Sequence, residues 1–138
     1  MGLVTELAII DDALCVSVTR NVVSIQANIQ TRSNCCWVDG SYVSGLNIDR
    51  TKKRTYCDID GIPRTSEGTA SMDFEIGNYI FRTEVHVGYK LKYRLILGFP
   101  FLQQYNCELC FRDFIMTVHK LPDTVQPHEP LVDRNIAE

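Results

Sequence analysis

The sequence predicts a small all-β domain with one short helix near its C-terminal end. Short runs of alternating or continuous apolar residues recur along the chain, and turn-forming residues separate them. Residues 99–105 alone have helical character, with Pro100 where the first turn of a helix tolerates it. Many short strands with frequent turns are typical of a small closed barrel, which is the architecture that we expect.

The strands expected in the first half follow from the apolar pattern. Residues 22–30 alternate clearly and place Val23, Ile25, Ala27 and Ile29 on one face. Residues 35–38 form a continuous apolar run, which is typical of a strand buried on both faces. The expected strands of this half are residues 14–18, 22–30, 35–38 and 54–59.

The second half contains the clearest hairpin. Residues 69–76 alternate strictly, Gly77-Asn78 forms a two-residue turn, and residues 79–87 alternate again. A further apolar run over 93–97 is closed by Gly98 and leads into the short helix. The expected strands of this half are residues 69–76, 79–87, 93–97, 107–111 and 114–118.

A chain of 138 residues suits one domain. We expect an N-terminal extension or first strand over residues 1–21 and the folded domain over residues 22–119. Residues 120–138 carry three prolines and many charges but no periodic apolar face. This composition predicts a tail with little structure of its own.

Composition excludes several function classes. The net charge is -3 and no basic stripe alternates with aromatic residues, so nucleic acid is not expected as a partner. No apolar stretch approaches the ~20 residues of a membrane span, and no secretion signal opens the chain. We therefore expect an intracellular, cytoplasmic protein whose six cysteines are reduced thiols.

The cysteines do not have the spacing of a metal site. Cys35 and Cys36 are adjacent, which is poor geometry for chelation, and Cys107 and Cys110 lie in an expected strand. Positions i and i+3 of a strand face opposite sides, so these two thiols do not converge. We expect no metal and no cofactor.

One carboxylate stands where chemistry is plausible. The apolar run 35–38 delivers Asp39 into the turn formed by Gly40 and Ser41. Aspartic proteases use two carboxylates within hydrogen-bond distance that share one proton. A chain with one such turn obtains the second carboxylate from its own copy across a two-fold axis.

The order of these elements resembles the retropepsin-like aspartic protease domains of Ty3/gypsy retroelements, plant pararetroviruses and cellular Ddi1-type proteins. The resemblance covers residues 22–119 and implies a homodimer in which Asp39 is the catalytic aspartate. It implies that Leu95 to Gly98, with Leu97 and Gly98 as its structural residues, is the strand that packs behind the catalytic turn. It also implies a flap, the hairpin that closes over bound peptide, with Asp60, Gly61, Ile62 and Gly68.

The turn departs from the family pattern. In the family a hydroxyl residue and then glycine follow the aspartate, whereas this chain has Asp39, Gly40 and then Ser41. Misplacement of catalytic groups by ~1 Å costs about 100-fold in rate. An ordinary Asp-Gly turn at a strand end is the alternative interpretation of Asp39. Other carboxylates are weaker candidates for the acid: Asp58, Asp60 and Asp73.

These observations predict a degenerate, inactive retropepsin-like domain, derived from a retroelement. Its expected role is a homodimerisation or protein-interaction module with a peptide or protein partner. The alternative is an active homodimeric aspartic endopeptidase of a retroelement or virus, with Asp39 from each chain forming the acid pair. A third interpretation is an unrelated small β-barrel without an enzymatic history.

Overall fold

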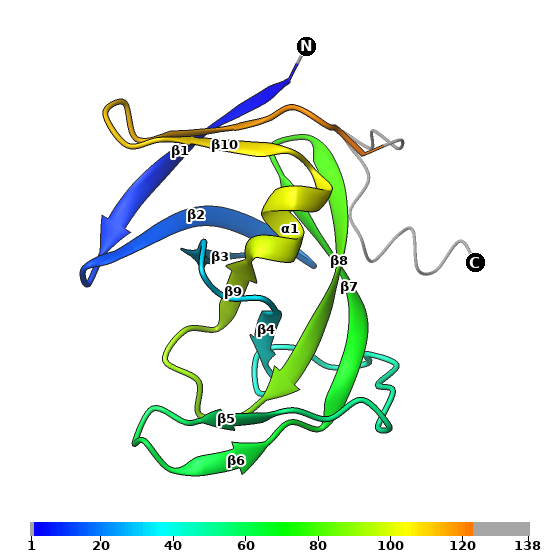
Figure 1. Ribbon diagram of the computed structural model, residues 1–138. Coiled ribbons are helices and arrows are strands. Elements are labelled where there is room, and N and C mark those ends of the chain that lie inside the picture. The colour runs from blue at the N-terminus through cyan, green and yellow to red at the C-terminus, as the bar shows by residue number, and fades with distance from the viewer. Residues whose placement is uncertain (1, 123–138) are drawn as a thin grey trace.

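The computed structural model describes residues 2–122, and these residues form an all-β fold with one short helix (Figure 1). The fold class expected from the sequence is therefore confirmed. The elements are β1 (Leu3–Ile10), β2 (Ala13–Arg20), β3 (Val23–Gln30), β4 (Cys36–Asp39), β5 (Thr55–Cys57), β6 (Pro63–Thr65), β7 (Gly68–Ile76), β8 (Tyr79–Gly88), β9 (Leu95–Gly98), α1 (Phe99–Gln104), β10 (Cys107–Cys110) and β11 (Ile115–Val118).

Each strand expected from the apolar pattern is present, and two further strands are found. β1 lies within residues 1–21, where an extension or a first strand was expected. β6 begins at Pro63 and pairs only with β5, so the missing N–H of proline interrupts no central ladder. The expected tail over residues 120–138 lies almost wholly outside the described residues.

Nine of the described strands form one sheet in the order β10-β11-β1-β2-β3-β9-β4-β8-β7. One bridge pair, Thr19 with Glu75, also links β7 to β2. The closed barrel itself stays a prediction. The β5–β6 hairpin forms a separate two-stranded sheet, at the end of the molecule opposite to β1 and β10 (Figure 1).

Strand β9 lies between β3 and β4, although both precede it by more than fifty residues. It is parallel to β3, with Gln30 beside Gly98, and antiparallel to β4, with Val38 beside Leu95. The chain leaves β3 at Gln30 and enters β4 at Cys36, so residues 31–35 pass around the Gly98 end of β9. Asp39, at the other end of β4, lies beside the Arg94 end.

The core is aromatic where α1 meets the β7–β8 hairpin. The ring of Phe81 lies 4.8 Å from that of Tyr105 and 5.8 Å from that of Phe101, measured between centroids. Phe74 completes the cluster, 5.7 Å from Phe101. The Tyr105 hydroxyl donates to the carbonyl oxygen of Arg82 at 2.8 Å, so the cluster also fixes the short helix onto β8.

Replacing Phe81 by alanine should destabilise the protein strongly, because the side chain is fully buried in this cluster. We expect a loss of ~3–5 kcal/mol in the free energy of unfolding, measured by urea denaturation. Phe111→Ala is the matched control, since Phe111 is 64% exposed. Equal losses for the two variants would contradict the aromatic packing of Phe81.

No helix among residues 2–122 has the length and apolar character needed to cross a membrane.

Candidate functional site

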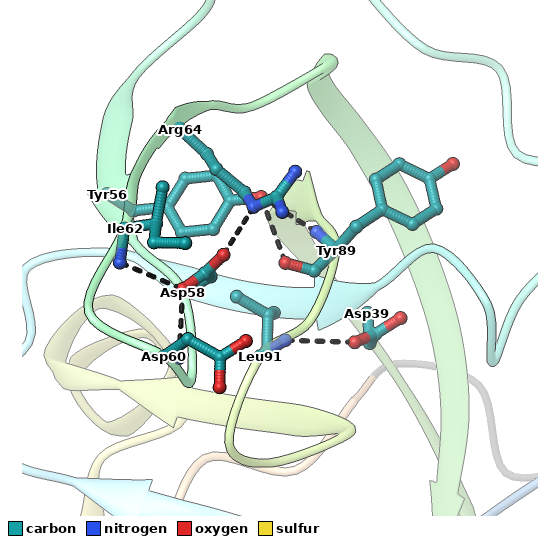
Figure 2. A network of polar contacts seen from close by, with 8 residues as sticks. All are labelled: Asp39, Tyr56, Asp58, Asp60, Ile62, Arg64, Tyr89 and Leu91. Carbon is teal, nitrogen blue, oxygen red and sulfur yellow. Dashed lines mark hydrogen bonds and ion pairs between the residues drawn. The ribbon is translucent and has the colours of Figure 1, made fainter.

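The carboxylate of Asp39 is buried and hydrogen-bonded by its own chain on both oxygens. The Ser41 backbone N–H and hydroxyl donate to Oδ1 at 2.9 and 2.6 Å. The Leu91 N–H donates to Oδ2 at 3.1 Å, from the loop that connects β8 to β9 (Figure 2). Asp39 therefore fastens the turn that follows β4 to the loop that precedes β9.

These contacts favour the ionised carboxylate. Burial by itself raises the pKa of Asp39, but the Ser41 and Leu91 hydrogen bonds and the nearby Arg94 charge lower it by more. The resulting pKa lies below the ordinary aspartate value. A carboxylate held in this way is a poor proton donor. In an aspartic protease pair, one of the two carboxyl groups must donate a proton.

The same local motif recurs where no chemistry is expected. Asp49, on an exposed loop, accepts from the backbone N–H and hydroxyl of Thr51 at 3.0 and 2.6 Å. Both motifs have the form Asp-x-Ser/Thr, in which the aspartate side chain mimics a backbone turn. The Asp39 geometry is thus that of a local turn motif, in agreement with the alternative interpretation of the sequence.

Gly40 allows an aromatic ring to lie against the turn. A Cβ atom at Gly40 would stand 2.5 Å from the Tyr89 ring, so the ring fills the space that a side chain would need. The Tyr89 hydroxyl donates to Glu67, which also pairs with Arg50 at 3.0 Å. The space beside Gly40, the residue that follows Asp39, is therefore occupied by the Tyr89 ring.

Three of the four residues expected in the flap, Asp60, Gly61 and Ile62, lie at the tip of the β5–β6 hairpin. Gly61 has a φ of +79°, which favours glycine. Buried Asp58 organises the tip, because its Oδ1 accepts from the N–H groups of Asp60 and Ile62, both at 2.9 Å. Its Oδ2 pairs with Arg64 Nε at 2.5 Å, and this hydrogen bond is the main cause of the lowered pKa of Asp58.

Gly68 lies outside the hairpin, at the start of β7. A Cβ atom there would stand 2.1 Å from the carbonyl oxygen of Asp49, so glycine permits two backbones to approach closely.

The hairpin is fastened to the loop that also holds Asp39. The Tyr89 N–H donates to the Tyr56 hydroxyl at 2.8 Å, and that hydroxyl lies 3.1 Å from the Tyr89 carbonyl oxygen (Figure 2). The Ile59 N–H donates to the Lys90 carbonyl at 2.7 Å. Trp37 packs beneath Tyr56, with the ring centroids 5.0 Å apart. Asp39 and the hairpin thus belong to one network centred on residues 89–91.

The Gly98 end of β9 lies away from Asp39, beside the end of β3. The Leu95 end of β9 lies beside β4, where Leu95 is the register partner of Val38, and Leu97 is fully buried. A Cβ atom at Gly98 would stand 2.7 Å from the Ser33 carbonyl oxygen and 2.3 Å from that of Cys35. The Phe99 N–H also donates to the Ser33 carbonyl at 2.7 Å. The turn behind which Gly98 packs is therefore residues 31–35.

This turn was not singled out from the sequence. It contains no carboxylate, and the residue beside Gly98 in the strand register is Gln30. The available signal was the alternating strand that ends at Gln30, followed by four polar residues. Asp39 is the more conspicuous chemical group in the sequence, because residues 31–35 contain no carboxylate.

The other sequence candidates do not assemble into a site. Asp73 pairs with Arg82 on the outside of the β7–β8 hairpin, at 2.7 Å. All six cysteines are free thiols. Within residues 2–122, no three His, Cys, Asp or Glu side chains are grouped so as to hold a metal ion.

Two solved structures resemble this chain. The retroviral protease-like domain of Ddi1 from Leishmania major matches with a TM-score of 0.61 and 14% identity, over 86% of this chain and 98% of that domain. The chain has a retropepsin-like fold. A retropepsin-like aspartic protease from Rickettsia conorii matches with a TM-score of 0.55 and 17% identity, over 85% of this chain and 90% of that protein. No family model and no curated protein sequence matches.

Replacing Asp39 by asparagine should destabilise the retropepsin-like domain. The asparagine NH2 group would replace one carboxylate oxygen and would face the N–H or O–H groups that now donate to that oxygen. At least one buried hydrogen bond is then lost, which lowers the free energy of unfolding by about 1–3 kcal/mol. Because the folded pKa of Asp39 is lowered, the wild-type advantage is complete above the ordinary aspartate pKa of ~4. It should shrink as the pH falls through the folded pKa.

Urea denaturation at pH 7 and pH 3 measures this difference. Asp49→Asn is the matched control, because it makes the same change in the same motif on an exposed loop, and we expect a smaller loss. An Asp39→Asn effect that grew toward low pH would contradict the assigned direction of the pKa shift.

Replacing Tyr56 by phenylalanine should loosen the hairpin, because the two contacts between its hydroxyl and Tyr89 are lost. We expect about three- to tenfold faster amide hydrogen exchange at residues 57–62. Tyr79→Phe, at the opposite end of β8, removes the same hydroxyl and should leave these amides unchanged. Equal exchange in the two variants would show that the hydroxyl does not fasten the hairpin.

Proposed function

We propose that this chain is a degenerate retropepsin-like domain without proteolytic activity, which acts as a homodimerisation or protein-interaction module. The observation that carries the proposal is the set of hydrogen bonds that hold the Asp39 carboxylate within its own chain. Both oxygens of the carboxylate accept hydrogen bonds from Ser41 and Leu91 of the same chain. A catalytic carboxylate must instead face its counterpart and a water molecule at hydrogen-bond distance.

The surroundings of Asp39 support the same conclusion. The Tyr89 ring covers Gly40, and the β5–β6 hairpin is fastened to residues 89–90 of its own chain. A peptide substrate needs the space beside the acid and a flap that can open over it. In this chain the Tyr89 ring occupies the space at Gly40, and hydrogen bonds from Tyr56 and Ile59 hold the hairpin to residues 89–90.

The tip of the hairpin supports a role in binding. Ile59 is 60% exposed and Ile62 is 53% exposed, and both lie within the turn that the Asp58 carboxylate orders. Two apolar side chains on a rigid tip are suited to a peptide or protein partner, because little conformational entropy is lost on binding. The free thiols fit a cytoplasmic location, which we include in the proposal.

The test is peptide cleavage. Purified protein and the Asp39→Asn variant are incubated with a peptide library at pH 4–6, and the products are identified by mass spectrometry. We expect no cleavage by either protein. Cleavage by the wild type that Asp39→Asn abolishes would overturn the proposal and would establish the alternative, an active homodimeric endopeptidase with Asp39 as its acid.

A further inference from the structure

The strongest concentration of charge in the chain is the loop that precedes β5. Arg50, Lys52, Lys53 and Arg54 are four of the chain's 14 Lys and Arg residues, and all four are exposed. The 10 other Lys and Arg residues stand against 17 Asp and Glu, so the rest of the chain is negative. Residues 50–54, named the basic loop, are therefore a positive patch on a negative background.

The basic loop is held at both ends by the β7 side of the molecule. Asp49, which precedes it, forms two backbone hydrogen bonds with Thr69, at 2.7 and 3.2 Å. At the other end, the Ser66 N–H donates to the Arg54 carbonyl at 2.8 Å, and the Arg54 N–H donates to the Ser66 hydroxyl at 2.9 Å. A backbone ordered in this way loses little conformational entropy when a ligand binds to it.

Most of the positive charge of this loop is not neutralised by its own chain. Arg50 forms an ion pair with Glu67 at 3.0 Å. Among residues 2–122, no carboxylate lies within ion-pair distance of Lys52, Lys53 or Arg54. Three cations on a fixed backbone are therefore free to pair with an external anion.

An uncharged aromatic surface adjoins the basic loop. The rings of Trp37 and His86 lie 5.0 Å apart, and Tyr56 lies 5.0 Å from Trp37 on its other contact. These three partly exposed residues are named the aromatic ledge. Burial and then the Arg54 charge lower the pKa of His86, so its imidazole is neutral at pH 7. Arg54 lies over this region, because its Nη2 donates to Asn34 Oδ1 at 3.5 Å.

The two features together fit a short acidic peptide better than an extended polyanion. A nucleic acid binds through many phosphates, and it would meet the negative charge of the remaining chain along its length. A few carboxylates match the three unpaired cations, and an apolar side chain next to them matches the aromatic ledge. Residues 90–94 carry three further cations, but that loop lies against Asp39, a carboxylate of the same chain.

We propose that the basic loop and the aromatic ledge bind a short acidic segment of a partner protein, in which Asp or Glu residues flank an apolar residue. The carboxylates pair with Lys52, Lys53 and Arg54, and the apolar side chain covers Trp37. The inference rests on the interaction role in the proposed function and adds the chemistry of the partner. Because Asp39 takes no part in these contacts, binding and cleavage are measured separately.

Fluorescence anisotropy of a labelled peptide tests the proposal. The probe is a fluorescein-labelled peptide of four glutamates around two leucines, and the comparison peptide has glutamine in place of each glutamate. We expect the full chain to bind the acidic peptide about tenfold more tightly. This affinity should fall between 50 and 300 mM NaCl, because salt screens exposed charges. Equal affinities for the two peptides would overturn the inference.

A pair of double variants locates the site. Lys52→Gln combined with Lys53→Gln should raise the dissociation constant of the acidic peptide about three- to tenfold. Lys90→Gln combined with Lys92→Gln is the matched control, because it removes the same two charges from exposed residues of the other basic stretch. We expect less than a twofold change for this control. Equal losses in the two double variants would show a general attraction to positive charge and would overturn the site.

The fluorescence of Trp37, the only tryptophan of the chain, tests contact with the aromatic ledge. Unlabelled acidic peptide should change the emission of the wild type and of the Lys90 and Lys92 variant alike. Unchanged emission at saturating peptide would overturn the inference. So would a single-stranded oligonucleotide of ten deoxythymidines that binds more tightly than the peptide and loses affinity in the Lys52 and Lys53 variant.

The two proposals fail in different ways. A chain that neither cleaves the peptide library nor prefers the acidic peptide would overturn this inference and leave the absence of proteolytic activity standing. Cleavage that Asp39→Asn abolishes would overturn the proposed function, whereas the comparison of the two lysine variants would still decide where the acidic peptide binds.

Discussion

The placement of β9 between β3 and β4 is the constraint on which the rest of the structure depends. β9 has only four residues and pairs with a strand on each side. It runs parallel to β3 and antiparallel to β4. The two ends of β9 consequently lie against different parts of the chain. Its Leu95 end adjoins Asp39 and the loop 89–94, whereas Gly98 adjoins the turn 31–35.

This separation gives the two ends different roles. At the Arg94 end, hydrogen bonds from Ser41 and Leu91 to the Asp39 carboxylate join the turn after β4 to the loop 89–94. Tyr56 fastens the hairpin to the same loop. These contacts are intramolecular, and they stabilise one arrangement of the loops. At the Gly98 end, the turn retains exposed polar groups, and the ring of Phe99 is exposed beside it. The retropepsin-like architecture is therefore compatible with an assembly role that requires no acid pair.

Much of the fold followed from local patterns in the sequence. Alternation predicted β3, β7 and β8, and glycines marked the ends of β7 and β9, because side-chain period and turn geometry are local properties. β1 was less visible, since Thr5 and Glu6 interrupt its apolar pattern. β6 was missed because it has three residues and begins with proline.

The site was harder to predict than the fold. An Asp-Gly turn at Asp39 could be considered from the sequence, because the Asp-x-Ser motif forms its hydrogen bonds within three residues. The neighbour of Gly98 was not predictable in this way, since it depends on pairing between residues nearly seventy positions apart. Asp39 was expected in front of the Gly98 strand because it carries a carboxylate, whereas the strand register places Gln30 beside Gly98.

The state of the Asp39 carboxyl is the central claim, and carbon-13 NMR of its side-chain carboxyl carbon, followed from pH 2 to pH 8, tests it most directly. A clasped carboxylate should titrate in one step, with a pKa below the ordinary aspartate value. An acid pair should instead titrate in two coupled steps, with one pKa raised well above that value. A two-step curve would contradict the clasped, ionised state of Asp39.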